Sequence, residues 1–450
     1  MTIRRLGVAA AAAVATLLAG AQGARALKPE DFLAWLEQNR QATPAFQPGD
    51  KITSADADKI RPFIMPGHVD ELIFDDMEMT IKPHSDLTPA DVYKEATAKY
   101  QSQVVIAQDG AIENYVAGEP FDETKLTTED PQAGFKAIWN FNFRWVHEGL
   151  DIGNVGWVWV RRGGSHDGHP VLGHRFGKAF GGGGSFERAL WGPYQRVYFS
   201  NRADLPDQDY QVEGSWARGT EFRELTEFNE PFDIRGTAFL ILRYSNPRKT
   251  DDAWAYIPSL RRVRRISVEV KSDSLLGTDH TLEDFYCFSG RPLEHDWKYH
   301  GTAKMLAIAR SRNAMTMYHG PNGWTPHDDW ELREVDVIEQ IPKLSNHPYS
   351  RKFLFTDREH HDCYAAASFD RAGELWKVWQ LSKSWTEDPW YSGKEKTPPG
   401  TRVSSFQSIN VIDKQNDRGT LVPCPDSQYP DNSVALVQRK MDVNQLSEGR

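Results

Sequence analysis

The chain has 450 residues, of which 53 are Lys or Arg and 63 are Asp or Glu, so its formal net charge is −10 at pH 7. This acidic balance disfavours nucleic acids and anionic membrane surfaces as partners, because both repel negative charge. After residue 26, no apolar run approaches the about 20 residues that a membrane-spanning helix needs, so we expect a soluble protein.

The first 26 residues have the features of a cleavable secretory signal. Arg4 and Arg5 form a short basic start, an apolar run covers 8–19, and Ala24-Arg25-Ala26 is the small-x-small pattern that signal peptidase recognises. Loss of Arg4, Arg5 and Arg25 would change the formal charge from −10 to −13. An uncleaved membrane anchor is the alternative, but the apolar run is too short to span a bilayer. We therefore expect export from the cytoplasm.

Residues 27–100 are predicted to form a helical N-terminal segment. Phe32, Trp35 and Leu36 recur at helical spacing behind an early proline. Thr88 is suited to cap a later helix that ends near residue 100, with Pro89 at its first position.

Residues 101–385 contain sequence patterns that are typical of strands and tight turns. Asp109-Gly110 predicts one hairpin turn, and Gly373 predicts another between strands at 364–369 and 374–379. Further strand-like runs lie at 141–146, 156–162, 196–199, 238–244, 253–257 and 264–270. Residues 386–450 show little periodicity and are expected to form an irregular C-terminal tail. Together these segments predict a mainly β fold with helices (α+β), in which a large antiparallel sheet is strongly curved or closed.

The three cysteines, Cys287, Cys363 and Cys424, match no zinc-binding spacing. In an oxidising compartment two of them could pair and leave one free thiol, or none could pair. The sequence does not choose between these outcomes.

The densest histidine cluster is a glycine-rich stretch that contains His166, His169 and His174. These histidines, with Asp167, could surround a metal ion, although a solvated surface loop is the simpler interpretation. The adjacent Ser165 lacks the final glycine of the hydrolase nucleophile elbow. A secreted metal-dependent hydrolase that uses the His166/His169/His174 loop is therefore kept only as an alternative.

A basic stretch follows the strand-like run at 253–257. Its four arginines could hold an anionic head group, or they could belong to a salt-bridged sheet exterior; they are Arg261, Arg262, Arg264 and Arg265.

Three distinctive stretches lie between residues 230 and 284. They are Glu230-Pro-Phe-Asp-Ile-Arg-Gly-Thr-Ala, Asp252-Ala-Trp-Ala-Tyr-Ile-Pro-Ser-Leu, and Ser272-Asp-Ser-Leu-Leu-Gly-Thr-Asp followed by Glu283 and Asp284. With them, the chain from about 85 to 380 resembles a family of exported Gram-negative proteins, the domain of unknown function 1329, whose members are often labelled outer-membrane lipoprotein-sorting-like.

The resemblance implies kinship with the lipoprotein carriers LolA and LolB and the sensor RseB. Those proteins bend an antiparallel sheet into an incomplete β-barrel around an apolar cavity, with helices covering one mouth. They hold acyl chains and are not enzymes. The resemblance further implies a periplasmic location, a lipid or other hydrophobic molecule as ligand, and an RND-type exporter or outer-membrane protein as partner. It defines no catalytic residue, cofactor or metal site.

The residues themselves also suggest a lined cavity, since alternate residues of a strand share a face. Phe239 and Ile241 share one face of their strand, and Trp254 and Tyr256 share a face of the next. The predicted ligand-binding set is Phe239, Ile241, Trp254, Tyr256, Leu276 and Trp376. We therefore predict a non-catalytic, periplasmic carrier of a hydrophobic ligand or an accessory of lipid transport. An envelope scaffold with a filled sheet interior is a further alternative.

Overall fold

The structure is a computed structural model that describes residues 25–165, 169–267, 272–391, 397–425, 427–428 and 434–447. Most strands of this part belong to one 16-stranded sheet. In spatial order they are β1 (Lys51–Thr53), β2 (Glu78–Ile81), β14 (Asp329–Pro342), β15 (Arg351–Asp357), β16 (Cys363–Phe369), β17 (Leu375–Trp385), β18 (Ser404–Asp413), β19 (Arg418–Pro423), β5 (Gly149–Ser165), β6 (Gly183–Tyr198), β7 (Thr220–Phe228), β8 (Thr237–Tyr244), β9 (Asp252–Ile257) and β10 (Arg262–Ile266). In addition, β11 (His295–Ala307) pairs with β14, and β20 (Ser427–Gln428) pairs with β5.

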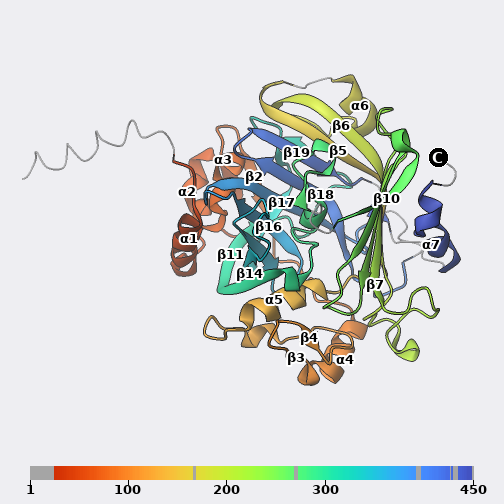
Figure 1. Cartoon of the computed structure of the whole chain (residues 1–450). Coiled ribbons are helices and arrows are strands. Elements are labelled where there is room, and N and C mark those ends of the chain that lie inside the picture. Colours follow the sequence, from red (N-terminus) through yellow and green to blue (C-terminus); the bar gives the residue numbers. More distant parts are fainter. Residues whose placement is uncertain are drawn as a thin grey trace, which may run out of the picture.

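The sheet is strongly curved and its path does not close, because it ends at β1 and β10. In Figure 1, β7 and β10 form one wall, β11, β14, β16 and β17 form the other, and β5 and β6 lie across the top. Its pairings are antiparallel except that of β2 with β14, which is parallel. The predicted mainly β fold with a large, incompletely closed sheet is confirmed.

Helices lie outside both walls, below the sheet and beside β6 at the top of the view (Figure 1). Their bounds are α1 (Pro29–Gln41), α2 (Ala57–Ile60), α3 (Val69–Leu72), α4 (Asp91–Tyr100), α5 (Ala133–Asn142), α6 (Pro170–Phe176) and α7 (Val434–Lys440). The lower end is covered by α4, α5 and the short hairpin of β3 (Val105–Ile106) and β4 (Ile112–Glu113). Two-residue strands β12 (Tyr318–His319) and β13 (Thr325–Pro326) pair with each other. None of the helices in the described ranges combines the length and the apolar character that crossing a membrane requires.

Local signals in the sequence located several elements well. Helix α1 buries Phe32 against Phe353, with ring centroids 5.8 Å apart. Both hairpin glycines adopt positive φ, 85° at Gly110 and 77° at Gly373. The later helix, α4, begins at Asp91 with Ala90 as its N-cap, so Thr88 does not cap it. The Thr88 hydroxyl instead donates to Glu359 at 3.0 Å.

The strand predicted at 141–146 is wrong. Residues 133–142 form α5, and the chain then leaves the helix. Ala133, Ala137, Ile138 and Phe141 are all buried in the core beneath the sheet. Because their spacing places them on one helical face, burial of that face outweighs the strand preference of the aromatic residues.

The irregular tail expected from 386 onward also differs from the structure. Residues 404–423 form β18 and β19, which lie between β17 and β5 in the middle of the sheet. At the other end of the chain, β1 and β2 bring the N-terminal segment into the same sheet. Strands from the N-terminal segment and from the C-terminal part of the chain therefore belong to one continuous sheet.

Each face of the sheet has its own hydrophobic core. The outer core contains Phe32 of α1 and Phe176 of α6. The inner core contains Phe141 of α5 and aromatic residues of a loop segment, 275–291, which we call the inner segment. The concave side of the sheet is thus occupied by the protein's own side chains.

Candidate functional site

The predicted ligand-binding residues lie on two different faces. In the register of β8 and β9, Leu240 is opposite Trp254, and residues opposite each other share a face. Phe239 and Ile241 therefore point into the inner core, whereas Trp254 and Tyr256 belong to a separate outer cluster that includes Met441 near the C-terminus. Leu276 and Trp376 pack against the inner core. The six residues do not line one common cavity.

Aromatic side chains of the inner segment fill the space between the two walls of the sheet. Phe285 stacks on Tyr194 of β6, with ring centroids 5.2 Å apart and an interplanar angle of 8°. Tyr286 contacts Phe406 of β18 at a centroid distance of 4.5 Å. These contacts attach the inner segment to β6 and to β18, so it lies on the concave face where the sequence predicted a hollow.

Buried charges of the sheet hold the inner segment. Asp284 accepts hydrogen bonds from Lys352 Nζ at 2.6 Å and from the Tyr349 hydroxyl at 2.8 Å. Asp279 accepts from Arg418 Nη2 at 2.6 Å. Although burial disfavours the charged form, Lys352 holds the pKa of Asp284 below its ordinary value. Paired in this way, the carboxylates can remain inside the fold.

A disulfide adds a covalent link between the inner segment and the sheet. Cys287 is bonded to Cys363 of β16, and Cys424 is buried and lies outside this bond. The structure therefore has one disulfide and one cysteine outside it, which is one of the outcomes that the sequence left open.

An open groove lies beside the inner segment, and we call it the rim groove. Its volume is about 380 Å³, and its lining includes Ser272, Glu283, Leu293, Glu294, His295, Lys343, Leu344 and His347. The Leu344 residue is 39 % exposed, so the groove can be reached from solvent. A volume of this size falls within the about 300–1,000 Å³ typical of small-molecule sites.

The polar part of the rim groove is a carboxylate between two imidazoles. Glu283 Oε1 lies 2.9 Å from His295 Nε2, and Glu283 Oε2 lies 3.3 Å from His347 Nε2. Gln340 Nε2 donates to Glu283 Oε1 at 3.2 Å. Burial opposes the charged carboxylate, but the two histidines, His295 above all, hold the pKa of Glu283 well below its usual range. The groove therefore combines leucine walls with an internally paired, polar floor.

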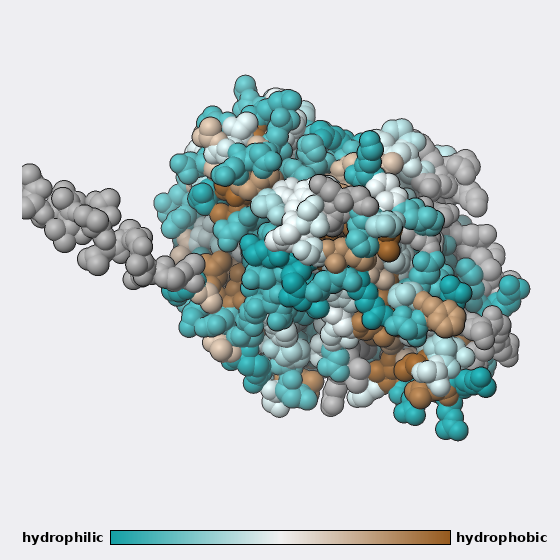
Figure 2. All heavy atoms as spheres, turned by 90° about the horizontal axis from the view of Figure 1, so that it is seen from above, coloured by the Kyte–Doolittle hydropathy of each residue, from teal (hydrophilic) through white to brown (hydrophobic). Residues whose placement is uncertain are grey.

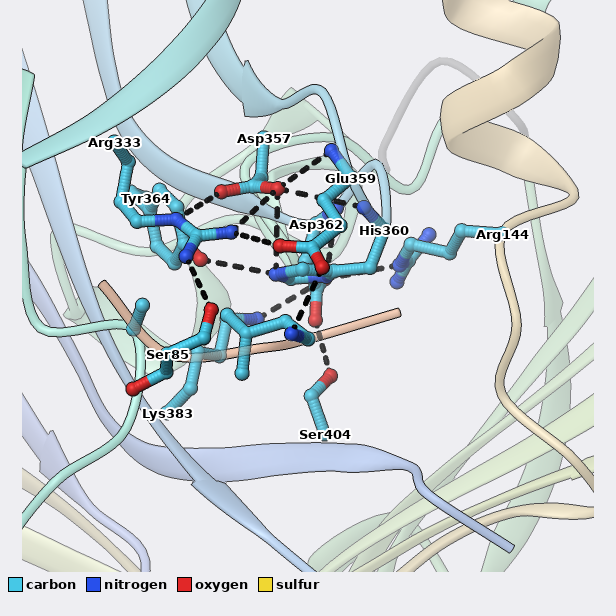
Figure 3. A network of polar contacts seen from close by, with 12 residues as sticks. Ser85, Arg144, Arg333, Asp357, Glu359, His360, Asp362, Tyr364, Lys383 and Ser404 are labelled. Carbon is cyan, nitrogen blue, oxygen red and sulfur yellow. Dashed lines mark hydrogen bonds and ion pairs between the residues drawn. The ribbon is translucent and has the colours of Figure 1, made fainter. Parts of the chain in front are cut away.

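A second buried polar network lies where β15, β16, β17 and β18 meet the loop after α5 (Figure 3). Asp362 accepts from Arg144 Nε at 2.9 Å, contacts Lys383 Nζ at 3.0 Å and accepts from the Ser404 hydroxyl. Two small cavities beside Arg144 measure about 20 and 30 Å³. Such volumes hold a water molecule but no hydrocarbon chain. We interpret this network as structural.

The four arginines of the basic stretch are exposed at the last strand of the sheet path. Arg265 pairs with Asp252 of the neighbouring strand. Charged side chains on an edge strand hinder pairing with another sheet, so the arrangement is typical of a sheet exterior. A role for Arg261, Arg262, Arg264 and Arg265 in binding an anionic head group remains a prediction.

The histidine-rich loop is only partly within the described structure. His166 and Asp167 lie outside the described residues. The ring of His169 lies 4.2 Å from that of Phe186 between centroids, and His174 is an exposed residue of α6. The metal-site hypothesis for this loop therefore stays a prediction.

Sequence reasoning missed the histidines of the rim groove. Glu283, His295 and His347 come from an inner-segment turn, the start of β11 and the loop before β15. No local spacing links such distant positions, so only the fold brings them together.

The groove's exposed leucine is one of a scattered set, since the large exposed hydrophobic residues are Val92, Val105, Val171, Phe232, Leu260 and Leu344. On the face seen in Figure 2, hydrophobic residues likewise form small patches separated by hydrophilic ones.

Several solved structures match much of this chain at low sequence identity. A domain from Vibrio parahaemolyticus named for outer membrane lipoprotein sorting has 19 % identity and a TM-score of 0.43, and the match covers 71 % of this chain and 100 % of that one. A DUF1329 family protein from Desulfovibrio piger has 15 % identity and a TM-score of 0.45, with 70 % and 98 % covered. A LolA superfamily protein from Nitrosomonas europaea has 14 % identity and a TM-score of 0.34, with 66 % and 92 % covered.

No match was found among curated proteins. The model of a protein family of unknown function, DUF1329, matches residues 51–170 and 183–414. These two stretches make up most of the chain and include nearly all of the large sheet. The chain therefore belongs to the DUF1329 family.

Proposed function

We propose that this protein is a periplasmic binding protein for a lipid-like, hydrophobic molecule, that it serves as a carrier or an accessory of envelope lipid transport, and that it performs no chemistry. The observation that carries the proposal is the rim groove, an open volume of about 380 Å³ with leucine walls. A hydrocarbon tail that enters such a groove leaves water, which is worth about 25 cal/mol per Å² of apolar surface buried.

The chemistry of the groove supports an amphipathic ligand. Leu293 and Leu344 offer apolar contact to a tail, while the exposed Lys343 offers a polar partner to a head group. The concave face of the sheet is not the site in this proposal, because the inner segment occupies it.

Location and partners follow from the expected export signal. A periplasmic carrier needs a protein that delivers or accepts its ligand, and we propose an RND-type exporter or an outer-membrane protein for that role. A pull-down from envelope fractions with the full chain as bait would test this part separately from ligand binding.

The groove is tested by lipid analysis and by two matched variants. Leu344→Asp places a charge in the groove wall, and Leu260→Asp changes a similarly exposed leucine, 45 % against 39 %, that does not line the groove. The probe is a dansyl-labelled undecanoic acid followed by fluorescence. We expect the wild type and Leu260→Asp to bind alike, and Leu344→Asp to bind about 10- to 100-fold more weakly, as the loss of one buried leucine contact predicts. Organic extracts of the purified wild type should contain lipid by mass spectrometry.

Two outcomes would contradict the proposal. One is a wild type that carries no lipid and does not bind the probe. The other is equal probe binding by the wild type and Leu344→Asp, because the ligand would then lie elsewhere.

The filled concave face favours a second candidate, an envelope scaffold that binds no small ligand. The aromatic contacts of Phe285 and Tyr286 leave the inner face packed, which suits a rigid frame as well as a carrier. A stable protein partner together with an absence of lipid and probe binding would support this candidate.

A further inference from the structure

Three potential metal ligands meet at the lower end of the sheet, outside the rim groove. They are Glu119 in the loop after β4, Glu123 in a short 3-10 helix, and His361 in the turn between β15 and β16. One ligand atom from each lies within 4.8 Å of the other two. This is the spacing at which a single ion can contact all three.

Neighbouring side chains hold the first carboxylate in place. His361 Nε2 lies 3.1 Å from Glu119 Oε1, and the two side chains are only 5 % and 15 % exposed. Asn140 Nδ2 donates to Glu119 Oε1 at 3.3 Å, and Gln101 Nε2 donates to the Glu119 backbone carbonyl at 3.3 Å. Fixed ligands of this kind need little reorganisation when an ion binds.

Acidic groups outnumber basic ones among the three ligands. Two carboxylates face one imidazole, and the guanidinium of Arg358 is engaged with the Glu123 backbone carbonyl and with Glu334. A divalent ion would satisfy both carboxylates at once while the imidazole stays neutral.

A comparable His–Glu pair elsewhere in the chain shows the contrast. His300 Nε2 lies 2.8 Å from Glu339 Oε2, and Arg351 Nη1 contacts the other oxygen of Glu339 at 2.8 Å. That single carboxylate already has two basic partners, so the pair needs no ion. The cluster at Glu119 has the opposite ratio of acidic to basic groups.

We propose that Glu119, Glu123 and His361 bind one divalent transition-metal ion of the zinc class. The ion ties the loop at 119–123 to the β15–β16 turn, and water completes its coordination. An imidazole ligand favours zinc and its neighbours over calcium and magnesium, which prefer oxygen ligands alone. This inference does not rest on the proposed ligand-binding function.

The test uses the full chain, freed of metal by a chelator and then exposed to Zn²⁺ in competition with a chromophoric zinc indicator. The variants are Glu123→Gln and His361→Asn, and the matched control is His300→Asn. We expect the wild type and the control to bind zinc alike and to gain in unfolding temperature when zinc is added. We expect each ligand variant to lose at least about 10- to 100-fold in zinc affinity and to lose the gain in unfolding temperature.

Glu123→Gln separates a lost ligand from a lost fold. It removes repulsion between two carboxylates, so the metal-free variant should unfold at the wild-type temperature or slightly higher, and yet it should not respond to zinc. Undiminished zinc affinity in Glu123→Gln and His361→Asn would place the ion elsewhere and overturn the proposal. A wild type that does not bind zinc, or that responds equally to Ca²⁺, would also overturn it.

Discussion

The disulfide that holds the inner segment allows a quantitative prediction. Cys287 and Cys363 are separated by 76 residues, and both are fully buried. For a loop of this separation, the chain-entropy relation gives about 4.5 kcal/mol of stabilisation at 25 °C, through a smaller conformational entropy of the unfolded state. We therefore expect the double variant Cys287→Ala/Cys363→Ala to lose about 4 kcal/mol in unfolding free energy.

The assay is equilibrium unfolding in urea, followed by tryptophan fluorescence, without reductant. The control is Cys424→Ala, which removes a buried thiol of the same size outside the bond. It should cost about 1 kcal/mol, because it loses only local contacts. Wild-type protein treated with reductant in denaturant should refold to the stability of the double variant when reoxidation is blocked.

Two results would refute this reasoning. If the double variant has the same urea midpoint as Cys424→Ala, the link does not constrain the unfolded chain. If thiol titration of the denatured, unreduced protein finds three free thiols, the bond does not form. A single reactive thiol is the expected result, since the thiol of Cys424 lies outside the disulfide.

Two further predictions concern buried polar groups. Asp362→Asn leaves Arg144 and Lys383 without their buried carboxylate and should cost about 3–5 kcal/mol in urea unfolding. Asp91→Asn, in an exposed ion pair, should leave the urea midpoint almost unchanged. Equal effects of the two changes would contradict the structural role of this network. Burial lowers the pKa of His68 to about 3, so the folded chain binds a proton there less readily than the unfolded chain does. The stability that His68 contributes is therefore complete above about pH 6.5 and falls as the pH decreases towards 3, with about 2 kcal/mol lost at pH 5. His68→Gln should lower the number of protons taken up on unfolding by up to one, so the urea midpoint should depend less on pH between pH 7.5 and 5. An unchanged pH dependence of the midpoint would show that other groups set it.

The packed concave face changes where a ligand is expected. The inner segment overlaps the stretch Ser272 to Asp279 with Glu283 and Asp284, which carries much of the resemblance to the family. In this chain those residues fill the space between the walls of the sheet, and Glu283 also lines the rim groove. The same segment therefore closes one candidate site and forms part of another.

The sequence by itself determined the features that depend on neighbours along the chain. The hairpin turns at Gly110 and Gly373 follow from local backbone preferences, as do α1 and most of α4. The predominance of strands between 149 and 385 follows from the density of alternating and β-branched runs. Such signals need no knowledge of distant partners.

Only the tertiary structure decided which faces of the strands meet and what lies between them. Register places Trp254 on the face opposite Phe239, because a shift of one residue reverses the side of the sheet to which a side chain points. Residues 404–423 become central strands because β17 and β5 offer them open edges, although their own pattern is weak. Glu283 meets His347, and Glu119 meets His361, only in the folded chain. The members of each pair lie far apart in the sequence, so no local preference of the chain encodes these contacts.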